Sequence, residues 1–151
     1  MPVANDTART IALASDHAGY TLKDKVKGWL ADGGYKVADL GTDSADSVDW
    51  SDYGLKIGET VGAGKADLGV AVCGSGIGIS LAANKAKGAR AANCTSGLMA
   101  RLTRAHNDAN ILCLGERLIG EEVARDCLKE FLSTEFEGGR HARRVDKLDQ
   151  D

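Results

Sequence analysis

Residues 67–78 read Asp-Leu-Gly-Val-Ala-Val-Cys-Gly-Ser-Gly-Ile-Gly, and this stretch is the part of the sequence most informative about the fold class. Its first half is a nearly continuous apolar run, which is typical of a strand buried on both faces of a parallel sheet. Its second half places three glycines within five residues, directly before a stretch with helical character. A strand that leads through a glycine-rich turn into a helix is the repeating unit of an α/β fold.

The same alternation extends along the chain on both sides of this stretch. Apolar residues at helical spacing, such as Leu22, Val26 and Leu30, indicate helices, and short apolar runs indicate strands. We expect strands at 10–15, 35–40, 67–73, 89–93 and 110–115. We expect helices at 21–32, 50–63, 79–87, 96–105 and 121–132, with a last short helix at 140–148.

This order of elements predicts one α/β domain over residues 1–151 with a parallel sheet that helices cover on both faces. The first nine residues form an extension to which we assign no role. In such sheets the ligand binds beyond the carboxyl ends of the strands. Polar residues follow the expected strands at those ends, which agrees with this rule.

The composition excludes several classes of protein. Lys and Arg number 19 against 22 Asp and Glu, so clustered positive charge for nucleic-acid binding is not expected. The sequence has neither an apolar run of membrane-spanning length nor a signal peptide. Its four cysteines lack Cys-x-x-Cys spacing, which favours reduced thiols in the cytoplasm. No Cys or His spacing suggests zinc, so we expect no metal.

The glycine-rich loop suits an anion, either a phosphate or a developing oxyanion, because its backbone can approach a ligand closely. It is not the dinucleotide fingerprint, since Ile79 stands at the third glycine position. The alternative is that these glycines only form a tight turn and bind no ligand. Cys73 ends the strand beside this loop, where a helix N-terminus favours a reactive thiolate. The alternative for Cys73 is a small buried apolar residue.

Basic residues are concentrated near the C-terminus, where residues 140–144 carry four potential cations in five positions. Arginine offers two parallel donors to a phosphate, so this run is a candidate phosphate clamp. The alternative is that these residues lie on a solvated helix face and bind no phosphate. His17, His106 and His141 are the three histidines, and each taken alone is more typical of a structural or merely exposed residue than of a functional one.

These pieces occur together, in the same order, in a known family. They are Asp16-His17-Ala-Gly19, Cys73-Gly-Ser-Gly-Ile-Gly-Ile-Ser80, Ala82-Ala-Asn-Lys85, Arg104-Ala-His-Asn-Asp-Ala-Asn110, Leu114-Gly-Glu-Arg117 and Glu137-Gly-Gly-Arg-His141. From about Thr10 to Val145 the chain resembles the type B ribose-5-phosphate isomerases. That family also contains galactose-6-phosphate isomerase subunits and allose-6-phosphate isomerase.

The resemblance implies a three-layer α/β/α sandwich with a five-stranded, Rossmann-like parallel sheet. It implies an intramolecular oxidoreductase that interconverts aldose and ketose phosphates through a cis-enediolate without a metal or other cofactor. The implied assembly is a homodimer or a dimer of dimers, with active sites at the subunit interface. The implied ligand is a small sugar phosphate, and ribose 5-phosphate with ribulose 5-phosphate is the leading pair.

The resemblance also assigns roles to individual residues. Cys73 would move the proton between C2 and C1, and Ser75 would move a proton between the two oxygens. His106, with Asp16, would open the furanose ring. Tyr53 would line the sugar site. The cis-enediolate would be held by the loop amides around Gly74, Gly76 and Gly78 together with Asn107. The phosphate would be bound by His17, Arg117, Arg140 and Arg144, some of them from the partner subunit.

The chain departs from the family pattern at two places. Some members carry a glutamate base where Ile79 stands, so this chain is of the cysteine-base type. Trp50 and Ser51 replace the residues that are usual at the rim of the sugar site, which leaves a six-carbon sugar phosphate as an alternative substrate. A non-catalytic sugar-phosphate-binding protein is a further alternative, although Cys73, Ser75 and His106 are all present.

Overall fold

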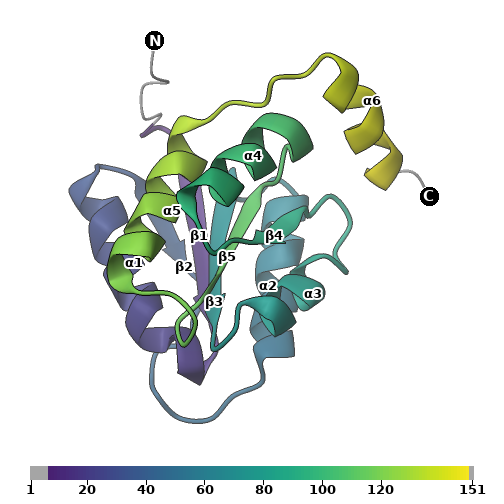
Figure 1. Cartoon of the computed structure of the whole chain (residues 1–151). Coiled ribbons are helices and arrows are strands. Elements are labelled where there is room, and N and C mark those ends of the chain that lie inside the picture. The colour runs from purple at the N-terminus through teal and green to yellow at the C-terminus, as the bar shows by residue number, and fades with distance from the viewer. Residues whose placement is uncertain (1–6, 150–151) are drawn as a thin grey trace.

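The computed structural model describes residues 7–149, which form a five-stranded parallel sheet between two layers of helices (Figure 1). The order of the strands is β2-β1-β3-β5-β4, and all four pairings are parallel. The strands are β1 (Thr10–Ser15), β2 (Lys36–Asp39), β3 (Leu68–Cys73), β4 (Ala91–Asn93) and β5 (Ile111–Gly115). Every residue of the central strand β3 is buried, as its apolar run predicts.

Helices cover both faces of the sheet, which confirms the predicted three-layer α/β class. The helices are α1 (Tyr20–Asp32), α2 (Trp50–Gly62), α3 (Ile77–Ala83), α4 (Gly97–Asn107), α5 (Glu121–Ser133) and α6 (Arg140–Asp146). Leu22, Ala100 and Phe131 place α1, α4 and α5 on one face. Ile57 and Ile79 place α2 and α3 on the other. Among residues 7–149, no helix has the length and apolar character needed to span a bilayer.

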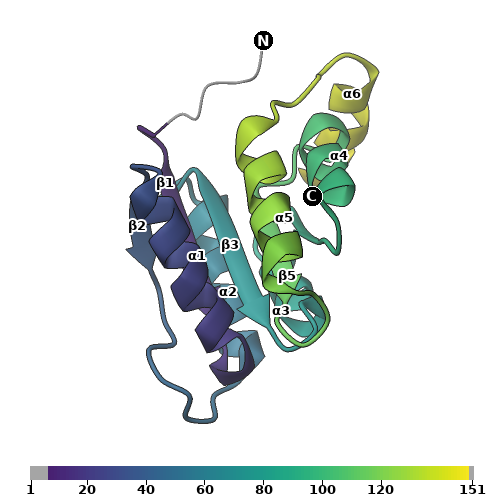
Figure 2. The ribbon, with the colours of Figure 1, turned by 60° about the vertical axis from the view of Figure 1, so that its left-hand side comes forward.

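The strands and the main helices run in opposite directions, so different parts of the chain lie at the two ends of the strands. All strands end on the side of the sheet where the loops after Ser15, Cys73 and Gly115 lie, and we call this side the carboxyl edge. Helices end at the opposite, amino edge. In Figures 1 and 2, α6 lies near the end of α4 beyond the amino edge, far from the point of the β3 arrow.

Most element boundaries differ from the sequence prediction by one or two residues, and α3 ends four residues early, at Ala83 and not at residue 87. Helix α3 begins at Ile77 and not Ile79, because Gly76 adopts φ 77° and turns the chain sharply after β3. A Cβ at Gly76 would collide with the Asn93 side chain, so only glycine fits there. Helix α4 continues to Asn107, which makes His106 helical and not part of a loop. The last helix ends at Asp146.

A partly buried ion pair holds the loop after β2. Lys23 Nζ donates to Asp39 Oδ1 at 2.6 Å, and the Lys23 side chain is only 3% exposed. The same Oδ1 accepts the Gly41 N–H, and Lys27 donates to the other oxygen. Partial burial raises the pKa of Asp39, but the bonds from Lys23, Gly41 and Lys27 outweigh it and lower the pKa from its ordinary value.

We therefore expect Asp39→Asn to reduce the free energy of unfolding by about 1–3 kcal/mol at pH 7, because it leaves the buried Lys23 charge without its partner. The folded pKa of Asp39 is depressed, so this stability is present above its unfolded pKa of about 3.9 and is lost as the pH falls through the folded value. Urea unfolding at pH 7 and pH 3 measures both effects.

The exposed pair of Lys25 with Glu121 is the matched control. Glu121→Gln should cost less than Asp39→Asn at pH 7, because solvent screens an exposed pair. Equal losses from the two substitutions, or a loss at Asp39 that persists unchanged at pH 3, would contradict this account.

Candidate active site

Cys73 lies at the carboxyl edge, where β3 gives way to the glycine-rich loop. Its side chain is nearly buried, and the Gly76 N–H donates to Sγ at 3.1 Å. The next amide, of Ile77, donates to Ser75 Oγ at 3.1 Å. The loop thus directs two backbone donors at the sulfur and the hydroxyl, and a thiolate accepts such a bond more strongly than a thiol does.

Two neighbouring strands fix the conformation of this loop. Asn93, at the end of β4, donates its Nδ2 to the Ser75 carbonyl at 3.2 Å. After β5, the Glu116 N–H donates to the Cys73 carbonyl and the Arg117 N–H to the Gly74 carbonyl. The Glu116 carboxylate also accepts the Leu22 N–H at 2.6 Å and so ties α1 to the site. Sequence reasoning did not identify these supporting roles, because the partners are distant along the chain.

Asp16 and His17 follow β1 at the same edge. The buried Asp16 carboxylate accepts the Gly19 N–H at 3.0 Å and caps the short 3-10 helix η1 (His17–Gly19). His17 Nδ1 accepts the Val48 N–H at 3.1 Å from the loop before α2. Because Nδ1 is used as an acceptor, the proton of a neutral His17 ring sits on Nε2.

These side chains surround a pocket of about 380 Å³. Its lining residues are Asp16, His17, Ala18, Trp50, Cys73, Gly74, Ser75, Gly78, Arg117 and Leu118. The volume is within the range of small-molecule sites. Tyr53 lines an adjoining depression with Asp49 and Lys56, and its ring lies against Gly41. The pocket combines a thiol, a hydroxyl, backbone donors and two cationic or donor side chains.

The other predicted site residues lie at the amino edge. His106 and Asn107 are in the last turn of α4, and they line a pocket of about 350 Å³ with His141 and Arg144 of α6. Arg140 begins the same helix α6. The sheet register pairs Gly69 with Ile111 and Cys73 with Gly115. The start of β5, just after α4, is therefore about 13 Å along the sheet from Cys73.

The predicted site residues of a single chain consequently form two separate groups, which we call the thiol half-site and the histidine half-site. The thiol half-site at the carboxyl edge contains Asp16, His17, Cys73, Ser75 and Arg117 with the loop glycines, and Tyr53 lies beside it. The histidine half-site at the amino edge contains His106, Asn107 and Arg144, and Arg140 is the first residue of the helix that carries Arg144 but does not line the pocket. The structure brings the members of each half-site together but does not bring the two half-sites together within one chain.

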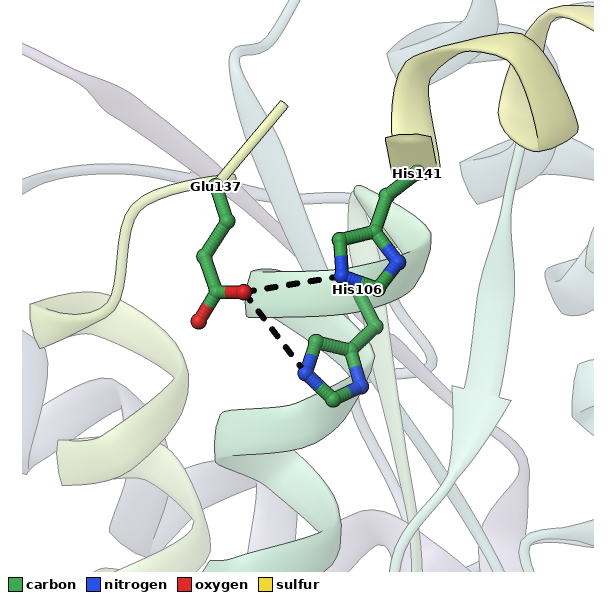
Figure 3. Close-up of side chains that lie close together, drawn as sticks. All are labelled: His106, Glu137 and His141. Atoms are coloured by element: carbon green, nitrogen blue, oxygen red, sulfur yellow. Dashed lines mark ion pairs between the residues drawn. The ribbon is translucent and has the colours of Figure 1, made fainter. Parts of the chain in front are cut away.

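The histidine half-site also holds a compact group of His106, Glu137 and His141 (Figure 3). Within residues 7–149 it is the one His, Cys, Asp and Glu group whose potential metal-ligand atoms lie within 4.8 Å of one another. The two imidazole rings are stacked, with centroids 4.4 Å apart and planes at 12°. A nitrogen lone pair lies in the plane of its ring, so nearly parallel rings do not direct both lone pairs at one ion. This arrangement favours proton handling over metal coordination.

The three other cysteines differ from Cys73 in their surroundings. Cys94, Cys113 and Cys127 are completely buried and line no pocket that contains a candidate catalytic group. Burial raises the pKa of the Cys94 and Cys127 thiols to about 11 and raises the pKa of Cys113 further. These thiols are therefore packing residues.

Comparison with known proteins gives consistent relatives over nearly the whole chain. A family model described as Ribose/Galactose Isomerase matches residues 11–148. Ribose-5-phosphate isomerase B of Escherichia coli (strain K12) is 39% identical over 140 residues, which cover 93% of this chain and 94% of the relative.

Solved structures of relatives match in the same way. Ribose-5-phosphate isomerase B of Clostridium thermocellum is 51% identical with a TM-score of 0.91, and the match covers 93% of this chain and 95% of that chain. Ribose-5-phosphate isomerase B of Mycoplasma genitalium, solved with bound ribulose-5-phosphate, is 39% identical with a TM-score of 0.89 and 93% coverage of both chains.

The contrast among the cysteines predicts selective alkylation. We expect iodoacetamide at pH 8 to modify Cys73 in the folded protein while Cys94, Cys113 and Cys127 stay unmodified. Cys73 lines a pocket, whereas a thiol with a pKa of about 11 is only about one part in a thousand ionised at pH 8. Peptide mass spectrometry after timed quenching identifies the modified residues.

The control is Cys73→Ala, which should take up no label when folded and three labels in urea. Modification of Cys94 or Cys127 in the folded protein as fast as Cys73 would contradict this assignment.

Proposed function

The chain belongs to the ribose/galactose isomerase family and is a sugar-phosphate isomerase, and we propose that it interconverts ribose 5-phosphate and ribulose 5-phosphate. We propose that Cys73 is the base and that the reaction needs no metal ion. The observation that carries this proposal is the Cys73 thiol in a pocket, beside Ser75 and in contact with a backbone N–H. The bound ribulose-5-phosphate of the Mycoplasma genitalium relative supports the choice of sugar.

The residues present supply each proton transfer of such an isomerisation. The Cys73 thiolate takes the C2 proton of the open-chain aldose, and the C2–H electron pair forms the C1–C2 double bond. The former carbonyl oxygen becomes part of an enediolate, whose charge the amides of the glycine-rich loop stabilise. Ser75 carries a proton between the two oxygens. The thiol then returns its proton to C1, which gives the ketose and restores the thiolate.

The phosphate is held at a distance from the reacting carbons. His17 presents Nε2–H and Arg117 its guanidinium to the pocket of the thiol half-site. Arg140 and Arg144 contribute further charge from the amino edge. Binding energy from this remote group orients C1 and C2 at the thiol.

We assign ring opening mainly to a group outside the thiol half-site. Ribose 5-phosphate is mainly a closed furanose, and His106, with Asp16, opens it before Cys73 acts. Cys73 and His106 lie at opposite edges of the sheet in one chain. We therefore propose that two copies of the chain join the thiol half-site of one to the histidine half-site of its partner, as a homodimer or a dimer of dimers. Exposed Leu98, Met99 and Leu102 on α4 and Leu81 on α3 supply apolar surface for this contact.

A six-carbon sugar phosphate is the second candidate substrate, and Trp50 is the residue that bears on it. Its ring borders the pocket and packs close to Gly78, where a Cβ would meet the indole at 2.8 Å. A six-carbon substrate places its phosphate one carbon farther from C1. We therefore expect the position of the indole to limit the length of the sugar phosphate that the pocket can bind. Comparison of kcat/KM for ribose 5-phosphate and allose 6-phosphate distinguishes the two candidates.

We expect Cys73→Ala to lose at least about a thousandfold of the ribose 5-phosphate turnover in the presence of EDTA, because the variant lacks the base that we assign to C2. The same variant should fail to remove deuterium from ribulose 5-phosphate that is deuterated at C1. Ribulose 5-phosphate is acyclic, since its phosphate blocks the O5 needed for a furanose, so this C1–D cleavage assay isolates the thiol chemistry from ring opening. NMR follows both reactions.

Wild-type activity that survives EDTA and disappears in Cys73→Ala agrees with the proposed base. Turnover by Cys73→Ala within tenfold of wild type would refute that assignment. Absence of turnover and of C1–D cleavage in the wild-type chain would refute the proposed substrate.

A further inference from the structure

We propose that Glu137 is a positioning residue for ring opening: its carboxylate holds the His106 imidazole against His141 and stabilises the positive charge that His106 carries while it transfers a proton. This inference rests on the proposed function in one respect, the role of His106 as the ring-opening group. Figure 3 shows the arrangement, with the Glu137 carboxylate facing both rings. Nothing in the motif pattern or the family resemblance assigned a role to Glu137.

The backbone brings Glu137 to His106 by a specific contact. The Glu137 N–H donates to the Ala105 carbonyl at 3.0 Å, one residue before His106 in α4. Gly138 and Gly139 then adopt positive φ values of 70° and 56°, and the chain turns into α6, which starts one residue before His141. The segment is thus attached to the end of α4 at the residue that carries the carboxylate.

The side chains converge on one carboxylate oxygen. Glu137 Oε1 lies 3.7 Å from His106 Nε2 and 3.5 Å from His141 Nε2. The His141 side chain is 12% exposed and the His106 side chain 42% exposed. His141 is therefore the fixed support on which the ring of His106 stacks, and His106 is the ring that a substrate can reach. A carboxylate beside Nε2 favours the proton there and leaves Nδ1 of His106 as the second functional nitrogen.

This arrangement fits the chemistry of ring opening. The C1–O4 bond of the furanose breaks as the C1 hydroxyl loses its proton and becomes the carbonyl, while O4 gains a proton and becomes a hydroxyl. A histidine that exchanges these protons is transiently an imidazolium, and a carboxylate that orients and neutralises it lowers the cost of that state. The present 3.5–3.7 Å separations exceed a hydrogen bond, and such contacts commonly tighten when substrate binds.

A merely structural role for Glu137 makes a different prediction. If the carboxylate only helped to hold α6, its loss would disturb Arg140 and Arg144, and every reaction of the bound sugar phosphate would suffer equally. If it acts through His106, only the reaction that begins from a closed ring should suffer. Turnover of ribose 5-phosphate begins from the ring, whereas C1–D cleavage of ribulose 5-phosphate does not.

The test compares Glu137→Gln with wild type in both assays. We expect ribose 5-phosphate turnover to fall at least about tenfold, because loss of the carboxylate that orients a proton-transferring histidine in a catalytic triad costs more than this. We expect C1–D cleavage of ribulose 5-phosphate to stay within about twofold of wild type. Glu135→Gln is the matched control, since Glu135 is an exposed carboxylate in the same segment, and it should alter neither rate.

A double variant shows whether Glu137 acts through His106. His106→Asn should lower ribose 5-phosphate turnover, and adding Glu137→Gln to it should cause no further loss, because the residue to be positioned is already absent. Unchanged turnover in Glu137→Gln, a parallel fall in both assays, or a full additional loss in the double variant would each overturn the inference. A wild-type chain inactive in both assays would instead refute the proposed function, so the two failures are distinguishable.

Discussion

The parallel sheet imposes the constraint on which the rest of the molecule depends. Because every strand runs in one direction, each main helix must run back, and strand ends and helix ends lie at opposite edges. Cys73 ends the central strand, and His106 is in the last turn of a helix. The same topology that buries the apolar run 68–73 therefore separates the two residues. A site that uses both requires a second copy of the chain.

Within each half-site, long-range contacts set the local geometry. In the thiol half-site, Asn93 and the amides after β5 hold the glycine-rich loop, and the loop directs the Gly76 N–H at the Cys73 sulfur. In the histidine half-site, one hydrogen bond between Glu137 and Ala105 attaches the segment that leads into α6. All four thiols are buried, but only Cys73 also lines a pocket that contains other candidate site residues, whereas Cys94, Cys113 and Cys127 serve packing.

The sequence predicts the sheet, its helical layers and the glycine-rich loop, because apolar periodicity and glycine spacing are local signals. It predicts less well those features that depend on a contact between residues far apart in the sequence. Helix α3 starts early because Gly76 turns against Asn93, 17 positions further along the chain. The carboxylates of Glu116 and Glu137 look like ordinary surface charges in the sequence, since their partners Leu22 and His106 are 94 and 31 positions away. The individual catalytic roles come from family resemblance and remain predictions.

If each active site joins half-sites of two chains, two inactive variants that are defective in different half-sites should complement each other. Cys73→Ala and His106→Asn chains are each defective in ribose 5-phosphate turnover, and the two are unfolded together, refolded as a mixture and assayed. Half of randomly formed dimers pair one chain of each kind, and one of the two sites in such a dimer has both residues intact. We therefore expect the mixture to recover about a quarter of wild-type turnover, because about one site in four then has both residues intact. Turnover no greater than the sum of the two separate variants would contradict this expectation.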